Sequence, residues 1–380
     1  MSQQSSFGIS RRNFIHGTTA GVIASSSLAQ LAGAQAAPAA AGKKVGYALV
    51  GLGSLTTRQI LPALKETKLS KCVALVSGDP NKAKKLAGEY GVDPKGIYNY
   101  ENYDTIKDNP DVDVIYIALP NGMHAEYTVR GAKAGKHIFC EKPMANSVAE
   151  CQQMIDACRE AKKKLMIAYR LRYEPINNAA IQMVRDKVMG PPRMITAEAG
   201  FYLPVQDPKN LPWRLNKKLA GGGPMLDIGI YALNATRYLT GEEPIEVNAM
   251  SYTPPNDPRF AQVEDAITWQ LKFPSGVLAN CATSYSAGQN RFQVDGRHGF
   301  IECDPFLSYG GLSLRKVIKG KSETVDFPQV NHFAAQFEHM SECVLHDKEP
   351  LTPGEEGLQD LKVIEAIYEA IKGGKTVKIT

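Results

Sequence analysis

Apolar runs and helix-period segments alternate along the first half of the chain. From residue 43 onward the strand-like runs are VGYALVGLG, CVALVSG, VDVIYIALP, HIFCEKP and LMIAYRLRY. Segments with apolar residues three and four apart separate them, for example TTRQILPALKET and SVAECQQMIDACREAKKK. This alternation predicts a parallel sheet with helices on both faces. We therefore expect a doubly wound α/β domain over residues 43–168.

The pattern changes near Arg170. After a helical segment, NNAAIQMVRDKV, the strand-like stretches follow one another with short connections such as PSG: RMITAEAGFYL, IEVNAMSY, AITWQLKF, VLANCATSYSA, RFQVDGRHGFIEC and LSLRKVIKG. Direct connections favour antiparallel pairing. Residues 169–380 are therefore predicted to form an α+β domain with an open, mostly antiparallel sheet. A helix over about residues 224–239 interrupts the strands, and two helices end the chain, the last expected to pack back on the first domain.

The N-terminal segment differs from both halves. SRRNFIHG is followed by a weakly apolar run rich in Gly, Ala and Ser, and Ala34-Gln35-Ala36 offers a small-x-small cleavage site. Paired arginines before such a run are typical of a twin-arginine export signal. We expect residues 1–36 to be this signal peptide and the mature protein to be periplasmic; the alternative is an N-terminus that is merely disordered.

Composition narrows the function classes. The 380 residues are 43% hydrophobic and 22% charged, as in an ordinary globular enzyme, and 44 basic against 39 acidic residues give +5. Removing Arg11 and Arg12 with the leader leaves +3. With no basic tract, this excess predicts no nucleic-acid partner. After the leader, no apolar run approaches the roughly 18 residues of a membrane span, so no membrane partner is expected.

The cysteines and histidines give no sign of a metal. Seven cysteines show no paired spacing, and no Cys/His cluster has the spacing of metal ligands. Cys151 and Cys158 lie seven residues apart on a predicted helix and so share a face. They are interpreted as core residues, and no metal is expected.

The stretch Gly51-Leu52-Gly53-Ser54-Leu55 lies between a predicted strand and a predicted helix. Gly51 permits a tight turn, and Gly53 lets the backbone approach a pyrophosphate held at the helix N-terminus. The third position of this dinucleotide fingerprint is Thr56 rather than Gly or Ala. A plain turn is the alternative; the flanking strand and helix favour a nucleotide loop in a Rossmann domain.

The end of the next strand favours NADP over NAD. An acidic residue about 20 positions after the glycines normally binds the ribose 2′-hydroxyl of NAD. Here the strand ends Val76-Ser77-Gly78, and no carboxylate occurs before Asp79. Ser77 and Lys82 suit a 2′-phosphate, although Lys82 on a solvated helix face is the alternative.

Two further motifs carry candidate proton-transfer chemistry. CEKPM places Lys142 at the carboxyl end of a predicted strand. GGGPMLDIGIYALN follows a glycine triplet, expected to be flexible, and places Asp227 and Tyr231 one helical turn apart. A tyrosine has a pKa of about 10, and a neighbouring ammonium favours its anion. Lys142, Asp227 and Tyr231 are thus predicted to handle a proton during hydride transfer; a surface lysine and a packing tyrosine are the alternatives.

With these residues the chain resembles the Gfo/Idh/MocA oxidoreductases, and within them the glucose–fructose oxidoreductase branch. The resemblance is carried by VGLG, GKHIFCEKPMANSVAECQQMIDA, WRLNKKLAGGG and DIGIYALNATRYLTGEEPIEV, and it extends from about Val45 to the last helix. It implies a sugar oxidoreductase with tightly bound NADP, glucose oxidised to its lactone, fructose reduced to sorbitol, and a homo-oligomer formed through the open sheet.

The resemblance also implies site roles. Tyr231 is implied as the acid/base, with Lys142, Asp227 and Arg172 near the sugar. The implied cofactor-binding residues besides the glycine loop are Ser77, Gly78, Lys82, Tyr100, Leu119, Pro120, Asn121, His124, Glu141, Lys142, Arg170, Trp213 and Arg214.

Two departures leave parts of this implication open. Only a short arm, APAAAGKK, precedes the first strand, which leaves the oligomeric state and the mode of cofactor retention open. Arg172 replaces a histidine near the expected sugar. A second aldose in place of fructose as the acceptor stays open for this reason. Three further functions also stay open: an NADP-dependent sugar dehydrogenase with exchangeable cofactor, an NAD-dependent glycoside hydrolase of the same superfamily, and a non-catalytic binding protein.

Overall fold

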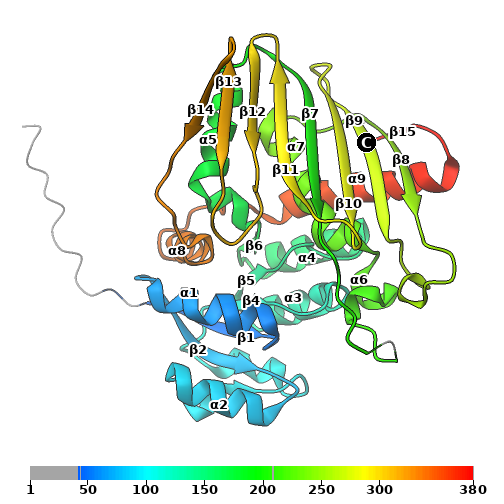
Figure 1. Cartoon of the computed structure of the whole chain (residues 1–380). Coiled ribbons are helices and arrows are strands. Elements are labelled where there is room, and N and C mark those ends of the chain that lie inside the picture. The colour runs from blue at the N-terminus through cyan, green and yellow to red at the C-terminus, as the bar shows by residue number, and fades with distance from the viewer. Residues whose placement is uncertain (1–41, 43, 208, 380) are drawn as a thin grey trace, which may run out of the picture. The chain divides into compact units, whose positions relative to one another are not determined.

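The computed structural model describes residues 42, 44–207 and 209–379. The predicted export signal over residues 1–36 lies outside these residues, so it stays a prediction. Figure 1 shows two sheets joined by helices in residues 44–379.

A six-stranded parallel sheet forms the first half of the described chain, as predicted (Figure 1). Its strand order is β3-β2-β1-β4-β5-β6, the order of a Rossmann domain. The strands are β1 (Val45–Val50), β2 (Ser70–Val76), β3 (Ile97–Tyr98), β4 (Val114–Ile117), β5 (His137–Cys140) and β6 (Leu165–Ile167). The two-residue strand β3 was not predicted; it is too short to leave an apolar run in the sequence.

Both faces of this sheet are covered by helices, so its strands read as continuous apolar runs. Ala48 and Val50 of β1 belong to the same core as residues of α3 (His124–Lys133) and α4 (Val148–Glu160). Tyr47 and Leu49 face the opposite way, toward α1 (Leu61–Glu66), α2 (Pro80–Tyr90) and α8 (His332–Leu345).

Helix α8 comes from near the end of the chain and completes the first domain. Its Phe337 ring lies 4.9 Å from that of Tyr47 and 5.1 Å from those of Tyr116 and Phe139. The contacts with Tyr47 and Phe139 are edge-to-face and the one with Tyr116 is tilted. Aromatic pairs stabilise packing by about 0.5–1.5 kcal/mol each beyond area burial. They pack the N-terminal half of α8 against the parallel sheet.

The second sheet has nine strands in the order β14-β13-β12-β11-β7-β10-β9-β8-β15. Only the pair β7–β10 is parallel; all other pairs are antiparallel, which confirms the predicted fold class. The strands are β7 (Pro192–Gly200), β8 (Glu246–Tyr252), β9 (Ala266–Lys272), β10 (Leu278–Ser284), β11 (Gln289–Gly296), β12 (Gly299–Cys303), β13 (Leu314–Ile318), β14 (Lys321–Val325) and β15 (Val377–Lys378).

Two predicted strands end differently in the structure. In LMIAYRLRY the strand stops at Ile167, and a 3-10 turn over Arg170–Tyr173 follows. RFQVDGRHGFIEC is a hairpin of β11 and β12 rather than one strand. Gly299 begins β12 with φ of 144°, where an added Cβ would lie 1.8 Å from the Val317 carbonyl oxygen.

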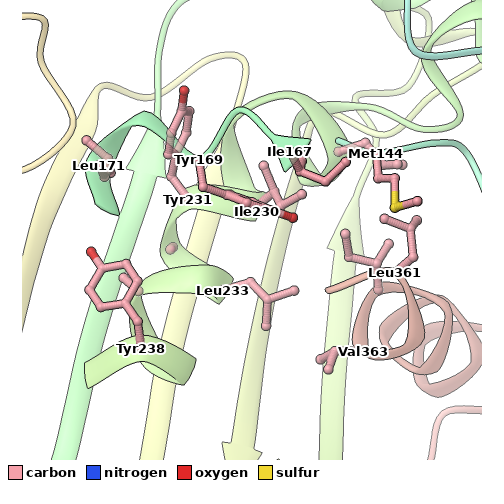
Figure 2. Close-up of a cluster of buried hydrophobic side chains, with 14 of the residues drawn as sticks. Met144, Ile167, Tyr169, Leu171, Ile230, Tyr231, Leu233, Tyr238, Leu361 and Val363 are labelled. Atoms are coloured by element: carbon pink, nitrogen blue, oxygen red, sulfur yellow. The ribbon is translucent and has the colours of Figure 1, made fainter. Parts of the chain in front are cut away.

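Three helices and the end of the first sheet share one core with the second sheet. They are α5 (Pro175–Arg185), α7 (Ile230–Thr240) and α9 (Gly354–Gly373). Figure 2 shows Ile230 and Leu233 of α7 beside Leu361 of α9, with Ile167 and Met144 above them. The last helix also meets α4, where Glu365 accepts the Val148 amide at 2.8 Å. This core fixes α7 relative to the carboxyl edge of the parallel sheet.

The cysteines are all free, and Cys151 and Cys158 are fully buried, so their interpretation as core residues is confirmed. In the part of the chain that the structure describes, no helix is long and apolar enough to cross a membrane.

Candidate active site

A cavity of about 880 Å³ opens at the carboxyl ends of the parallel strands. Gly51 follows β1, Ser77 follows β2, Ala118 follows β4 and Glu141 follows β5, and all four line it. The strand order reverses between β1 and β4, which is where open α/β sheets bind ligands. Every predicted site residue lines this cavity except His124 and Arg172.

The glycine loop has the geometry of a nucleotide loop. Gly51 has φ of 90°, and an added Cβ would lie 2.4 Å from the Ala118 carbonyl oxygen. An added Cβ at Gly53 would meet nothing within 4 Å, so the space in front of this backbone is open. Thr56 replaces the third glycine and closes the loop, since its hydroxyl donates to the Gly51 carbonyl at 2.6 Å. A pyrophosphate fits this cradle.

A second part of the cavity rim lies where β2 ends and α2 begins. The Ser77 hydroxyl accepts the Asp79 amide at 3.0 Å. The Asp79 carboxylate caps α2, because its Oδ1 accepts the amides of Asn81 and Lys82 at 3.0 Å each. Asp79 is therefore engaged by the helix start. Ser77, Lys82 and Tyr100 form a rim suited to a 2′-phosphate.

His124 lies behind the cavity wall. It is buried, and its ring nitrogens lie 2.8 Å from the Pro143 carbonyl oxygen and 2.9 Å from that of Leu119. Both carbonyls belong to segments next to the cavity. The structure therefore gives His124 a place between two loops and no exposure to the cavity.

Glu141 and Lys142 stand side by side at the end of β5. The Tyr116 hydroxyl donates a hydrogen bond to the Glu141 carboxylate at 2.5 Å. Burial raises the pKa of Glu141, although Tyr116, Lys142 and Arg170 oppose this. Lys142 Nζ donates to the Asp227 carbonyl oxygen at 2.5 Å and lies 3.9 Å from its carboxylate. The ammonium is thus directed into the cavity by the backbone of Asp227.

Asp227 is held as an anion by three neighbours. Arg214 Nε donates to its carboxylate at 2.7 Å, and the Tyr285 hydroxyl donates at 3.1 Å. Burial alone would raise the pKa of Asp227, but the charges of Arg214 and Lys142 and these hydrogen bonds lower it overall. The carboxylate is therefore charged near neutral pH and orients Lys142 and Arg214.

Tyr231 lies between two cations. Lys142 Nζ is 4.7 Å from its ring centroid, and the Arg170 guanidinium is 5.0 Å from it. Arg170 Nε also donates to the Tyr231 hydroxyl oxygen at 3.1 Å. Negative charge that develops on this oxygen when its proton leaves is stabilised by both cations. The site can therefore transfer a proton at Tyr231 beside a bound dinucleotide.

Models of one protein family match both halves of the chain. A model described as an oxidoreductase family with an NAD-binding Rossmann fold matches residues 45–169, and a GFO/IDH/MocA C-terminal domain matches residues 178–302. The chain belongs to the GFO/IDH/MocA oxidoreductase family. The resemblance seen in the sequence motifs is confirmed.

Proteins of known structure or named activity resemble the chain over most of its length. The crystal structure of aldose-aldose oxidoreductase from Caulobacter crescentus is 50% identical, with a TM-score of 0.86, and the match covers 88% of this chain and all of that one. D-xylose 1-dehydrogenase [NADP(+)] of Haloarcula marismortui is 32% identical over 88% of this chain and 93% of its own. D-xylose 1-dehydrogenase (NADP(+)) 2 of Haloferax volcanii is 26% identical over 88% and 99%.

Arg172 does not reach the cavity of this GFO/IDH/MocA protein. It lies 3.7 Å from Glu356 and 5.6 Å from the Tyr238 ring centroid. Because the 3-10 turn points Arg170 and Arg172 to different sides, only Arg170 lines the cavity. Arg172 contributes to the contact between α7 and α9.

The glycine triplet is fixed in place. An added Cβ at Gly221 would lie 2.4 Å from Asn146 Oδ1, one at Gly222 would lie 2.2 Å from the Tyr368 hydroxyl, and one at Gly223 would lie 2.3 Å from the Glu264 carbonyl oxygen. The expectation of a flexible triplet is therefore wrong. Close approach of three segments, rather than mobility, requires glycine here, and it holds the turn before Asp227.

The cavity has further walls that the sequence motifs did not reveal. They come from the second sheet and α8, and include Phe201, Asn290, Leu307, Ser308, Tyr309 and Phe333. Tyr309 is 56% exposed, and its ring lies 4.7 Å from the Arg170 guanidinium. No local motif marks these residues, because they meet the site only through strand pairing and the return of α8. Within the described residues, no cluster of His, Cys, Asp or Glu suits a metal ion.

Proposed function

We propose that this protein is an NADP-dependent sugar oxidoreductase that oxidises one aldose to its lactone and reduces a second aldose to the alditol. The observation that carries the proposal is the position of Tyr231 between the cations of Lys142 and Arg170, in one cavity with a glycine loop and Ser77. The Caulobacter protein, whose name states aldose–aldose chemistry, supports the choice of substrates.

The residues of the chain divide the work of proton transfer. NADP, when bound, would accept a hydride from one sugar and give it to the other. Tyr231, as its anion, takes the hydroxyl proton of the first sugar and later returns that proton to the carbonyl oxygen of the second. Lys142 and Arg170 stabilise the charge on the tyrosine oxygen meanwhile. Asp227 holds Lys142 in place through its backbone carbonyl and its carboxylate.

We propose NADP as the cofactor because the end of β2 lacks a free acid. Replacing Ser77 by Asp is expected to weaken NADP retention by about 100-fold, since a carboxylate at this position repels a 2′-phosphate and suits the ribose of NAD. The measurement is the identity and amount of nucleotide released when the purified protein is denatured. Ser77→Asn serves as the control, because asparagine has the shape of aspartate without its charge, and this variant is expected to retain NADP.

Export gives a reason for the two-sugar cycle. If the segment at residues 1–36 directs the folded protein to the periplasm, the cofactor has to be retained there without a free pool. Nanomolar retention requires about −12 kcal/mol of binding free energy. A second sugar that reoxidises the bound cofactor then removes the need for exchange.

A spectroscopic experiment tests the proposal. The purified, thoroughly desalted protein is expected to develop the near-ultraviolet absorbance of reduced nicotinamide when an aldose such as glucose is added. The absorbance is expected to disappear when a second aldose or fructose follows. A protein that is empty after desalting, or that reacts only with added coenzyme, contradicts the two-sugar cycle.

The second candidate is a sugar dehydrogenase that exchanges NADP in every turnover. The similarity to the D-xylose 1-dehydrogenase of Haloarcula marismortui favours it. It predicts steady turnover with free NADP and loss of the nucleotide on gel filtration.

We propose in addition that the open sheet pairs two copies of the chain. On the face of this sheet turned away from α7, side chains such as Met250, Thr268, Gln270 and Leu278 are exposed. Charged pairs such as Arg291–Glu198 and Arg315–Glu302 lie on the strands of the same sheet. Apolar and uncharged polar groups bordered by charged ones suit an interface between subunits. Size-exclusion chromatography with light scattering tests this, and Met250→Lys is expected to shift the protein toward monomer.

A further inference from the structure

Arg170 is held by three acceptors from three different segments. Its Nε donates to the Tyr231 hydroxyl on α7, its Nη2 donates to the Leu307 carbonyl after β12, and its Nη1 lies 3.3 Å from His332 Nε2 on α8. Arg170 as a residue is 4% exposed, so these contacts replace water around the guanidinium. Of these three partners, His332 belongs to none of the sequence motifs and has no part in the proton transfer proposed for Tyr231.

His332 is a rigidly mounted acceptor. It is the first residue of α8, and Asn331 before it caps the helix by accepting the amides of Phe333 and Ala334 at 3.1 and 3.2 Å. Asn331 also donates to Glu66 at 3.0 Å, and Phe337 anchors the next turn on the parallel sheet. The position of the imidazole is therefore set by the start of α8 and does not shift with the Arg170 side chain.

The contact requires a neutral imidazole. Arg170 Nη1 can only donate, so His332 Nε2 must carry a lone pair and the proton must be on Nδ1. An imidazolium at His332 would have no lone pair on Nε2 to accept the Arg170 hydrogen bond. It would also place a second positive charge 3.3 Å from the guanidinium. Burial and the Arg170 charge lower the pKa of His332 to about 3, which agrees with this geometry.

We propose that His332 is a positioning residue for proton transfer: by accepting from Arg170, it keeps the Arg170 Nε–H directed at the Tyr231 hydroxyl. The inference rests on the proposed role of Tyr231. With the phenol oxygen accepting from Arg170, the proton that Tyr231 takes up from the first sugar is left to face the cavity, from where it returns to the second sugar. Without His332, Nη1 loses its partner, and the guanidinium is drawn toward the buried carboxyl of Glu141, with which it already interacts.

A pair of nearly isosteric substitutions tests the proposal. His332→Gln keeps an acceptor atom on an unbranched chain, whereas His332→Met has the same length and no comparable acceptor. We expect His332→Met to lower kcat by about tenfold, with KM for the sugar unchanged within about twofold. The kinetic isotope effect on kcat, measured with an aldose deuterated at its anomeric carbon, is expected to rise as chemistry becomes slower. His332→Gln is expected to restore most of the turnover.

The matched control is His339→Met on the same helix. His339 accepts the Leu351 amide at 2.9 Å and does not line the cavity, so its loss is expected to lower thermal stability without a change in the isotope effect. The amount of nucleotide that stays bound after desalting, measured on the denatured protein, is expected to be equal in all variants. Equal kcat in His332→Met and wild type, or a raised KM alone, overturns the proposal.

A measurement on the unmodified protein is independent of the folding of any variant. Nitrogen NMR of the histidine side chains is expected to show one buried histidine, absent from His332→Gln, as the neutral Nδ1–H tautomer near neutral pH. A protonated ring or the Nε2–H tautomer overturns the proposal. A wild-type enzyme that turns over no sugar or other alcohol contradicts the proposed function instead, while the tautomer still decides whether His332 accepts from Arg170.

Discussion

Tyr231→Phe is expected to lower turnover by about 10² to 10⁴-fold, the usual contribution of a positioned acid/base. The variant loses only the hydroxyl that accepts from Arg170 at 3.1 Å; its ring still lies between Lys142 and Arg170. Fold and bound nucleotide are therefore expected to persist. Steady-state kcat, together with the nucleotide content of the denatured protein, measures this.

Tyr238→Phe on the same helix is the control for this experiment. Its hydroxyl donates to Asn177 Oδ1 at 3.2 Å, away from the cavity. Its removal is expected to cost about 1 kcal/mol of unfolding free energy and to leave turnover unchanged. Equal activity of Tyr231→Phe and Tyr238→Phe would exclude Tyr231 as the acid/base.

The second large effect is expected for Lys142→Met, with kcat lowered by about 10² to 10³-fold. The substitution keeps most of the side-chain length but removes the ammonium above the Tyr231 ring and its hydrogen bond to the Asp227 carbonyl. The Asp227 carboxylate keeps Arg214 and Tyr285 as partners, so the local structure is expected to survive. Initial rates with each sugar and thermal unfolding measure the two parts of this prediction.

Lys164→Met separates this effect from the loss of any buried lysine. The Lys164 side chain is 9% exposed, its ammonium lies 2.9 Å from Asp347, and it does not line the cavity. This variant is expected to lose some stability and no activity. If both lysine variants lose activity equally, the ammonium of Lys142 has no specific part in the reaction.

The parallel sheet and its ligand edge were predictable because local signals there agree with one another. Strands β1, β4 and β5 are mostly apolar on both faces and are followed by Gly51, Ala118 and Glu141, which the parallel arrangement gathers at one edge. Spacing within motifs was enough to identify Lys142, Asp227 and Tyr231. The hairpin of β11 and β12 was missed because its two-residue turn interrupts the apolar pattern too briefly.

The sequence by itself determined the two sheets, the nucleotide loop and the residues that carry the proposed chemistry, because each depends on periodicity or on neighbours within a few positions. Only the tertiary structure decided how those residues are held. Arg170 meets Tyr231 across 61 positions and His332 across 162. The glycine triplet is fixed by Tyr368 and Glu264, which are also distant in the chain. Contacts of this separation depend on how α7, α8 and the second sheet pack, and no local pattern of side chains records that packing.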